Sequence, residues 1–266
     1  MLFRNYMFSS FFSFQALMFA WIFLSTTTAS PSFAEVMTAR ADAWCPYNCV
    51  PNSDKPGILI ELLQESFKSE GTTIDYGLLS WTQAVNSVRE GKFNAIIAAA
   101  AEDAVGMVHT EQPQVTQTSC VYGLLSSTKK VSKATDLKSF KSLGIVKDYS
   151  YGDMTNKILK SPAMKKILSP IGGEQAVETN LRRVVDKKIE AFMEDSKVVE
   201  FYLKSNNITN VKELGCTEDR MPLWIAFTAT NPKSKGWVST LAAGHAALEK
   251  SGRLSEIMAR YGITNK

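Results

Sequence analysis

The chain has 266 residues, of which 45% are hydrophobic and 21% are charged, a composition typical of globular proteins. This length allows one large domain or two lobes. Lys and Arg outnumber Asp and Glu by only 30 to 26, and the basic residues are scattered along the sequence. We therefore expect no nucleic-acid partner.

The N-terminus has the pattern of a secretory signal peptide. Arg4 is the only charged residue before Glu35, and an apolar run extends from Phe11 to Leu24. Small residues follow, so we predict that residues 1–34 are removed by cleavage after Ala34 and that the mature protein is periplasmic. An uncleaved membrane anchor is the alternative, but the apolar run is shorter than the roughly 20 residues that a spanning helix needs.

The exported part contains four cysteines: Cys45, Cys49, Cys120 and Cys216. In an oxidising compartment an even number of cysteines predicts disulfides, and four allow three pairings. We favour Cys45–Cys49, which would close a small loop, together with Cys120–Cys216. His109 and His245 are not spaced with a cysteine as metal ligands are, so we expect neither a metal nor a cofactor.

The first part of the exported chain alternates between strand and helix patterns. Strands are predicted at 38–44, 73–79 and 93–100, and helices at 58–71 and 80–92. Gly71 and Gly91 are expected to end the two helices. In the second helix we expect three side chains to face inward: Ala84, Val85 and Val88.

The later part of the chain continues the alternation. Helices are predicted to begin after residue 136 and after residue 153. Two more are predicted on either side of a strand at Ile189–Met193. The last two are predicted from 233 to about 250 and at 252–262. Further strands are predicted at 119–127, Leu143–Val146 and 221–230. Repeated strand–helix–strand units predict a mostly parallel α/β sheet.

The order of these elements resembles the type 2 periplasmic solute-binding proteins of the amino-acid-binding class. Four stretches carry the resemblance: 80–99, 136–153, 180–196 and 241–262. It implies two α/β lobes with mixed sheets, joined by two extended crossovers, with a ligand enclosed between them by hinge closure. Lobe 1 would be residues 35–118 plus 222–266, and lobe 2 residues 119–221. Cys120–Cys216 would lie where both crossovers enter lobe 2.

One family feature is missing from this sequence. Members that bind amino acids have an Arg after the strand that corresponds to "NAIIAAA", and its guanidinium grips the α-carboxylate of the ligand. Here no Arg occurs between Gly91 and Leu181, and the turn contains Glu102 and Asp103. The family's acid for the ligand ammonium corresponds to Asp195. The resemblance therefore implies a cleft with an anionic end and no cationic end.

Several interpretations of this charge pattern stay open. A cationic or neutral ligand would be held by Asp195 with Glu102 or Asp103. An anionic ligand would instead dock on backbone amides at the helix start after "KDYSYGD". Glu102 and Asp103 could also only cap a helix. A distant arginine could replace the missing one, and the candidates are Arg182, Arg183 and Arg220.

Aromatic and small residues supply the rest of the expected ligand-binding cleft: Trp44, Tyr47, Trp81, Ala99, Tyr149, Ser150, Tyr151 and Trp224. Aromatic faces stack on planar groups and attract cations by ~0.5–2 kcal/mol each. Ala99 belongs to a run of alanines that leaves an open ledge at a strand end. Packing in the core is a rival role for Trp224, which lies in an apolar strand.

The expected function is that of a monomeric, exported solute-binding protein, which captures a small polar ligand and delivers it to an ABC-type permease. The alternative is a ligand-sensing module for a membrane receptor or kinase. An enzyme similar to cyclohexadienyl dehydratases ranks last. Its chemistry needs a placed general acid and a group that holds the substrate carboxylate, and the sequence lacks both the expected Arg and a Ser-His-Asp pattern.

Overall fold

The computed structural model describes residues 1–3 and 35–263. Apart from its first three residues, the predicted signal peptide lies outside this range. The strands are β1 Val36–Ala41, β2 Thr73–Leu78, β3 Ala95–Ala99, β4 Met107–His109, β5 Val115–Leu124, β6 Leu143–Val146, β7 Leu168–Ile171, β8 Ala191–Asp195 and β9 Val211–Thr228. The α-helices are α1 Ile58–Phe67, α2 Trp81–Arg89, α3 Asp153–Leu159, α4 Ala176–Val185, α5 Ser196–Ser205, α6 Ser234–Ser251 and α7 Arg253–Arg260. Three 3₁₀ helices are η1 Lys68–Glu70, η2 Ala134–Ser139 and η3 Pro162–Met164.

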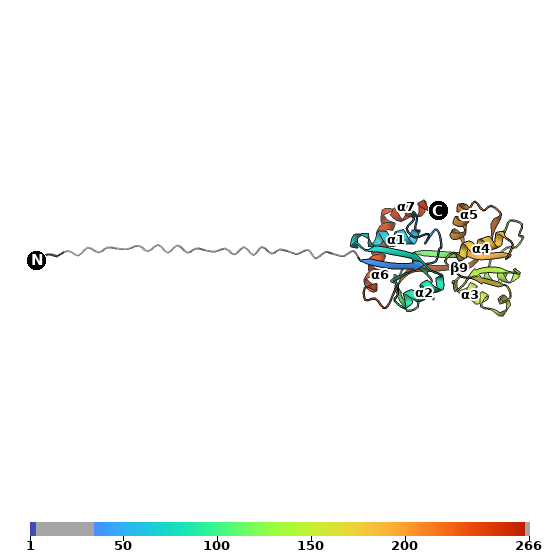
Figure 1. Cartoon of the computed structure of the whole chain (residues 1–266), viewed down its shortest axis with the longest axis horizontal. Helices are drawn as coiled ribbons and strands as arrows, with labels where there is room; N and C mark the ends of the chain where they lie inside the picture. The colour runs from blue at the N-terminus through green and yellow to red at the C-terminus, as the bar shows by residue number, and fades with distance from the viewer. Residues whose placement is uncertain (4–34, 264–266) are drawn as a thin grey trace. The chain divides into compact units, whose positions relative to one another are not determined.

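These strands form one mixed sheet in the order β2-β1-β3-β9-β5-β8-β6-β7, and β4 also pairs with β9 (Figure 1). β1 runs parallel to β2 and β3, and β6 runs parallel to β7 and β8, as the predicted strand–helix–strand units require. The sheet is mixed because β5 and β9 run antiparallel to each other and to the strands beside them. Within the described ranges, no helix has the length and apolar character needed to cross a membrane.

Two long strands connect the two halves of the sheet, and we call the β5–β9 pair the crossing ribbon. Residues 211–223 of β9 pair with β5, whereas its last residues pair with β3 and β4. The first half holds β1–β4 with α1, α2, α6 and α7, and the second half holds β6–β8 with α3, α4 and α5. Figure 1 shows the ribbon running between these two groups of helices.

Helix α2 shows how the local sequence sets the limits of an element. Ser80 and Gln83 form a capping box at its start. The three side chains that we expected to face inward are buried: Ala84, Val85 and Val88. Beyond its end, Gly91 has φ 77°, and a Cβ there would lie 2.2 Å from the Thr230 hydroxyl oxygen. Glycine therefore ends the helix, as predicted.

Both predicted disulfides are confirmed. Cys45–Cys49 closes the loop that follows β1. Cys120 on β5 and Cys216 on β9 face each other across the crossing ribbon and are bonded. The second bond therefore fastens together the two strands that join the halves.

The structure corrects several predicted boundaries. β9 begins at Val211, ten residues before the expected start, because "VKELGCTEDR" carries many charges and has little hydrophobic signal until it pairs with β5. β4 and β7 were not predicted, and both are short. The helix expected near "DLKS" is the 3₁₀ helix η2, and the strand expected at Ile189–Met193 is shifted to β8.

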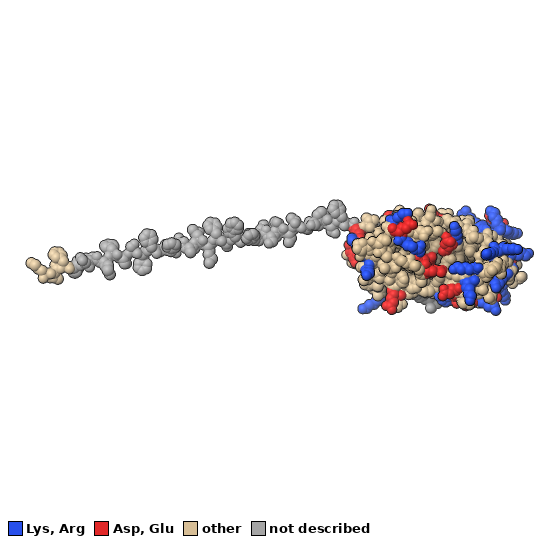
Figure 2. Space-filling model, turned by 90° about the horizontal axis from the view of Figure 1, so that it is seen from below, with Lys and Arg blue, Asp and Glu red and all other residues tan. Residues whose placement is uncertain are grey.

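Basic residues that are scattered in the sequence gather on one half of the surface. Residues 119–221 carry 18 Lys and Arg against 13 Asp and Glu. Figure 2 shows many Lys and Arg side chains at the end of the molecule formed by the second half. This outer surface contrasts with the space between the halves, where acidic side chains are buried.

Candidate functional site

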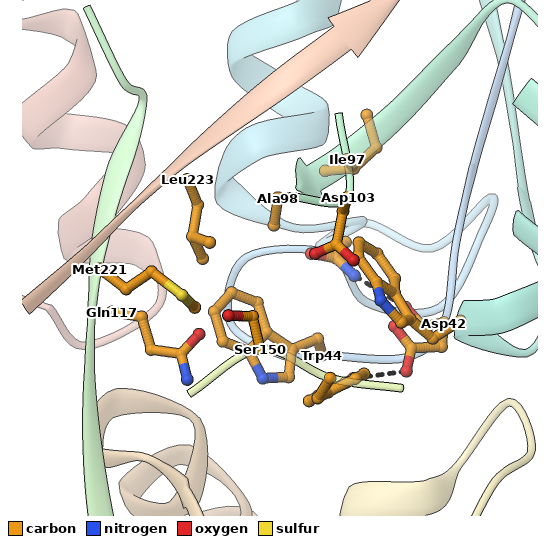
Figure 3. Close-up of a pocket in the computed structure, with 12 residues that line it drawn as sticks. Asp42, Trp44, Ile97, Ala98, Asp103, Gln117, Ser150, Met221 and Leu223 are labelled. Carbon is orange, nitrogen blue, oxygen red and sulfur yellow. Dashed lines mark hydrogen bonds between the residues drawn. The ribbon is translucent and has the colours of Figure 1, made fainter. Parts of the chain in front are cut away.

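A narrow cavity lies between the two halves, beside the crossing ribbon (Figure 3). Its lining residues are Asp42, Trp44, Asn48, Trp81, Ile97, Ala98, Asp103, Gln117, Tyr149, Ser150, Met221 and Leu223. The cavity volume, counted as the space open to the centres of water molecules, is about 20 Å³. That is close to what one water molecule needs. The halves are therefore closed on each other, and a larger ligand requires them to move apart.

The cavity lies where strands of both halves end. Asp42 directly follows β1, Ala98 lies in β3, and Asp103 lies in the turn after β3. Tyr149 and Ser150 follow β6 in the second half. The carboxyl ends of parallel strands meet at one edge of a sheet, which is the usual place for ligands in α/β proteins.

Five of the eleven predicted ligand-binding residues line this cavity: Trp44, Trp81, Asp103, Tyr149 and Ser150. The other six lie outside its lining: Tyr47, Ala99, Glu102, Tyr151, Asp195 and Trp224. Seven lining residues were not singled out from the sequence: Asp42, Asn48, Ile97, Ala98, Gln117, Met221 and Leu223. Contact with a ligand stays a prediction for the eleven residues that the sequence indicated.

Three of the predicted aromatic residues pack beside the cavity instead of lining it. The ring of Tyr47 lies against Trp44, with centroids 4.8 Å apart. Trp224 lies against His109 at the same distance. Tyr151 is buried, and its hydroxyl accepts a hydrogen bond from a backbone N–H of β6. Of these contacts, the one between Tyr47 and Trp44 supports a ring that lines the cavity.

Asp42 is the acid of the first half that the sequence did not reveal. It is 2% exposed, and its carboxylate accepts a hydrogen bond from the hydroxyl of Tyr149 in the second half. Burial raises the pKa of Asp42 to about 7. Near neutral pH this carboxyl is thus poised between its neutral and charged forms.

Asp103 is the second carboxyl in the cavity wall. It accepts a 3.2 Å hydrogen bond from Ala100 N, and burial raises its pKa to about 7. Arg89 donates to the backbone carbonyl of Asp103 at 3.0 Å, and its charge offsets part of the effect of burial on the pKa of the carboxyl. Helix capping is not the role of Glu102 and Asp103, because the turn leads into β4 and not into a helix. Glu102 is exposed and accepts a hydrogen bond from Asn156 in the second half at 2.9 Å.

The alanine ledge has a distorted backbone. The backbone of Ala98 has φ 62°, a left-handed conformation that residues other than glycine rarely adopt. The pairing of β3 with β9 shifts register between Ile96 and Ala99, around this residue. Such strain costs on the order of 1–3 kcal/mol and tends to occur at functional sites. Ala98 lines the cavity, so the strain points to the same place as the buried acids.

Hydrogen bonds between the two halves close the cavity, and we call them the closing contacts. They are Tyr149 hydroxyl to Asp42 carboxylate, Trp44 Nε1 to Glu194 Oε1 at 2.8 Å, Thr82 Oγ1 to Asp148 Oδ2 at 2.6 Å, Asn156 Nδ2 to Glu102 Oε1 at 2.9 Å, and Ala43 N to Glu174 O at 2.8 Å. Trp81 and Tyr149 also meet edge to face, with centroids 5.7 Å apart. Each contact breaks if the halves separate, so together they favour the closed form.

Asp195, the acid expected to hold a ligand ammonium, is occupied by the protein itself. Its Oδ1 accepts backbone N–H bonds from Lys197 at 2.9 Å and Val198 at 3.2 Å, which caps α5. Its Oδ2 accepts from Thr118 N at 3.0 Å. It is 1% exposed, and burial raises its pKa to about 6. The carboxylate therefore caps α5 and connects it to β5.

Its neighbour Glu194 faces the first half. Glu194 is fully buried, and burial raises its pKa to about 8. Its Oε1 accepts from Trp44 Nε1, while Oε2 has no hydrogen-bond partner in the part of the chain that the structure describes. A neutral carboxyl explains how this group is tolerated in the interior near neutral pH.

No Lys or Arg belongs to the cavity lining within residues 35–263. Arg182 pairs with Glu178 at 2.6 Å, Arg183 donates to Asn180 at 2.9 Å, and Arg220 donates to backbone carbonyls on β9. None of these three arginines reaches the cavity. Replacement of the missing arginine from this set, one of the interpretations left open, is thus contradicted.

The start of α3, considered as a dock for an anion, is already occupied by a carboxylate of the chain. Asp219 accepts from Thr155 N at 2.8 Å, from Thr155 Oγ1 at 2.7 Å and from Met154 N at 3.3 Å. These are the groups that an external anion would need. The expected docking of an anion at the start of α3 is therefore wrong for this structure.

Replacing Trp44 with Phe is expected to lower the free energy of unfolding by about 1–3 kcal/mol more than Trp81→Phe does. Both indoles are buried, at 4% and 7% exposure, and both line the cavity. Trp44 Nε1 donates to Glu194, whereas Trp81 Nε1 has no hydrogen-bond partner among the described residues. Urea unfolding of both variants measures the difference, and equal losses would show that the Trp44–Glu194 bond contributes nothing.

Neither a family model nor a curated protein matches this sequence. Solved structures do match it over most of its length. An ancestral arginine-binding protein bound to arginine superposes with a TM-score of 0.71 at 16% identity, covering 85% of this chain and 97% of that one. An amino acid ABC transporter substrate-binding protein from Streptococcus pneumoniae, bound to L-arginine, gives 0.69 at 15%, covering 86% and 94%. A histidine kinase sensor domain with similarity to periplasmic binding proteins gives 0.71 at 16%, covering 88% and 98%.

The chain has the two-lobed type 2 periplasmic-binding-protein fold. The fold expected from the sequence resemblance is thereby confirmed. At 15–16% identity the comparisons show the fold alone, so the ligands of these proteins do not carry over to this cavity.

Proposed function

We propose that this protein is an exported solute-binding protein that encloses a small polar ligand between two lobes and presents it to an ABC-type permease. Lobe 1 is residues 35–118 plus 222–266, lobe 2 is residues 119–221, and the crossing ribbon is the hinge. Residues 1–34 are a signal peptide, removed on export to the periplasm. The mature protein acts as a monomer without a cofactor.

One observation carries this proposal: the cavity wall comes from both halves, and the closing contacts join the same two halves. Separation of the halves opens the cavity and breaks these bonds, while a bound ligand would add contacts to both sides. Ligand binding is in this way coupled to closure. Closure changes the outer surface of the protein, which a membrane partner can recognise.

A sensor for a membrane receptor or kinase is the second candidate. It is favoured by the structural similarity to a histidine kinase sensor domain. Both candidates capture a ligand in the same way and differ only in the membrane partner. An enzyme is less well supported, since neither His109 nor His245 belongs to the cavity lining among the described residues.

The test uses protein that has been unfolded and refolded to remove small molecules, then mixed with a small-molecule extract of the cells that produce it. We expect a fraction of the extract to raise the Tm. Mass spectrometry of the extract before and after incubation tests for catalysis. Conversion of a component would favour an enzyme, and failure of every fraction to stabilise the protein would contradict ligand capture.

A further inference from the structure

The cavity wall contains a buried acceptor that the protein leaves without a partner. Asn48 is 1% exposed, and its Nδ2 donates to the Asp42 backbone carbonyl at 2.7 Å. Its Oδ1 has no hydrogen-bond partner among the residues that the structure describes. Buried polar atoms are normally paired, so an orphan acceptor in a cavity wall indicates a donor that comes from outside the chain.

The charge of the wall specifies the kind of donor. Asp42 and Asp103 are the two carboxyl groups of the wall. They lie close enough that their negative charges repel each other when both are ionised. The Asn48 oxygen is a third acceptor among the lining residues. Figure 3 shows Asp42 and Asp103 on one side of the cavity, opposite Gln117, Met221 and Leu223. A positively charged N–H donor would satisfy these acceptors and remove the repulsion.

Aromatic and apolar groups complete the cavity. The indoles of Trp44 and Trp81 and the phenol of Tyr149 line it near the carboxyls. Aromatic faces attract cations by roughly 0.5–2 kcal/mol each. Ile97, Met221 and Leu223 also line the cavity, and they offer an apolar surface to a hydrocarbon chain.

The same wall rejects a carboxylate. A ligand carboxylate normally meets a guanidinium, an ammonium or free backbone N–H groups. Among the described residues, the lining includes no Arg or Lys, the unpartnered Nε1 of Trp81 is a single neutral donor, and the start of α3 is capped by Asp219. A carboxylate placed against Asp42 and Asp103 would meet like charges in a site with little solvent, which is strongly unfavourable.

We propose that the cavity binds a small aliphatic amine or guanidine without a carboxylate, held by Asp42 and Asp103 with the Asn48 oxygen as a third acceptor. This proposal rests on the proposed function and names its ligand class. It shifts the ammonium-binding role from Asp195, whose carboxylate caps α5, to two acids of the first half. Of these, the sequence had pointed to Asp103 alone.

Isothermal titration calorimetry on the stripped protein tests the proposal with matched pairs of probes. Agmatine is arginine without its carboxylate, and cadaverine is lysine without its carboxylate. At least one amine is expected to bind ten-fold or more tightly than its parent amino acid. Binding of arginine or lysine as tight as that of the amines would overturn the ligand class.

Variants locate the site. Asp42→Asn and Asp103→Asn keep the side-chain shape and are each expected to weaken amine binding ten-fold or more. Asp186→Asn, an exposed acid that pairs with Lys188 at 3.1 Å, is the control and should bind as the parent protein does. Thermal melts confirm that each variant is folded. Unchanged affinity in both cavity variants would overturn the proposal.

An error in the ligand class and an error in the proposed function would give different results. If neither amine binds but a fraction of the cell extract stabilises the protein, the ligand class is wrong and solute binding stands. If neither the amines nor any fraction stabilises it, the proposed function fails, and this proposal fails with it.

Discussion

Removal of the Cys120–Cys216 disulfide is expected to lower the free energy of unfolding by about 4–5 kcal/mol. The bond joins residues 96 positions apart, and closing a loop of about 100 residues removes roughly 4.7 kcal/mol of chain entropy from the unfolded state. It also fastens β5 to β9 in the ribbon that connects the halves. The double variant Cys120→Ala/Cys216→Ala should therefore melt well below the parent protein.

The second disulfide supplies a matched control for this experiment. Cys45–Cys49 closes a loop of only four positions, for which the same relation gives about 2 kcal/mol. Urea unfolding of the two double variants measures both losses. A loss for Cys120–Cys216 that does not exceed the loss for Cys45–Cys49 would contradict the assignment of the crossing ribbon as the covalently fastened base of the hinge.

The second large effect is a fall in the free energy of unfolding as the pH rises from about 4 to about 8. Burial raises the pKa of Asp42 and Asp103 to about 7, of Asp195 to about 6 and of Glu194 to about 8. In the unfolded chain these carboxyls titrate near pH 4. Between these values the folded state holds more protons than the unfolded state, so raising the pH favours unfolding.

Asp42 shows the size of this effect. Its pKa rises from 3.8 to about 7, which at about 1.4 kcal/mol per unit amounts to on the order of 4 kcal/mol lost across the window. The titratable groups that act on it are acids and tyrosines, and none of them is cationic: Asp103, Glu194, Tyr76, Tyr149, Tyr151 and Tyr202. Asp42→Asn should therefore be more stable than the parent protein at pH 8 and should show a flatter profile.

Thermal melts between pH 4 and pH 8 measure this dependence, with Asp186→Asn as the surface control that should follow the parent protein. A Tm that rises with pH over this window would show that the buried acids are charged and stabilised in the folded state. A cationic ligand has the opposite dependence, because it binds the charged carboxyls. Amine affinity is therefore expected to increase from pH 5 to pH 8.

Much of the fold could be predicted because its local patterns are strong. The capped helix α2, the glycine after it and the buried strand β3 each have a clear signal within a few residues. The first ten residues of β9 could not be predicted in the same way. Their backbone is satisfied by β5, which lies about 90 positions earlier in the chain, and their side chains are largely polar.

Residues of the candidate site were predicted only where an acidic or aromatic residue lay close to the end of a predicted strand. Asp103 and Tyr149 follow strands that were recognised, whereas Asp42 was placed inside a predicted strand, which in fact ends at Ala41. Gln117 and Met221 line the cavity from the crossing ribbon, and no local pattern distinguishes them. Asp195 was assigned to the ligand although an Asp directly before a helix is a common N-cap; its second oxygen is bonded by Thr118, 77 positions earlier in the chain, which no local pattern shows.

The most direct measurement is a crystal structure of the protein purified from its own cells with the small molecule that it retains. We expect density between the lobes for a molecule with a basic nitrogen and no carboxylate, with that nitrogen about 3 Å from the carboxylates of Asp42 and Asp103. An α-amino acid whose carboxylate is bound there by an arginine, or a ligand held away from these two acids, would contradict the central interpretation.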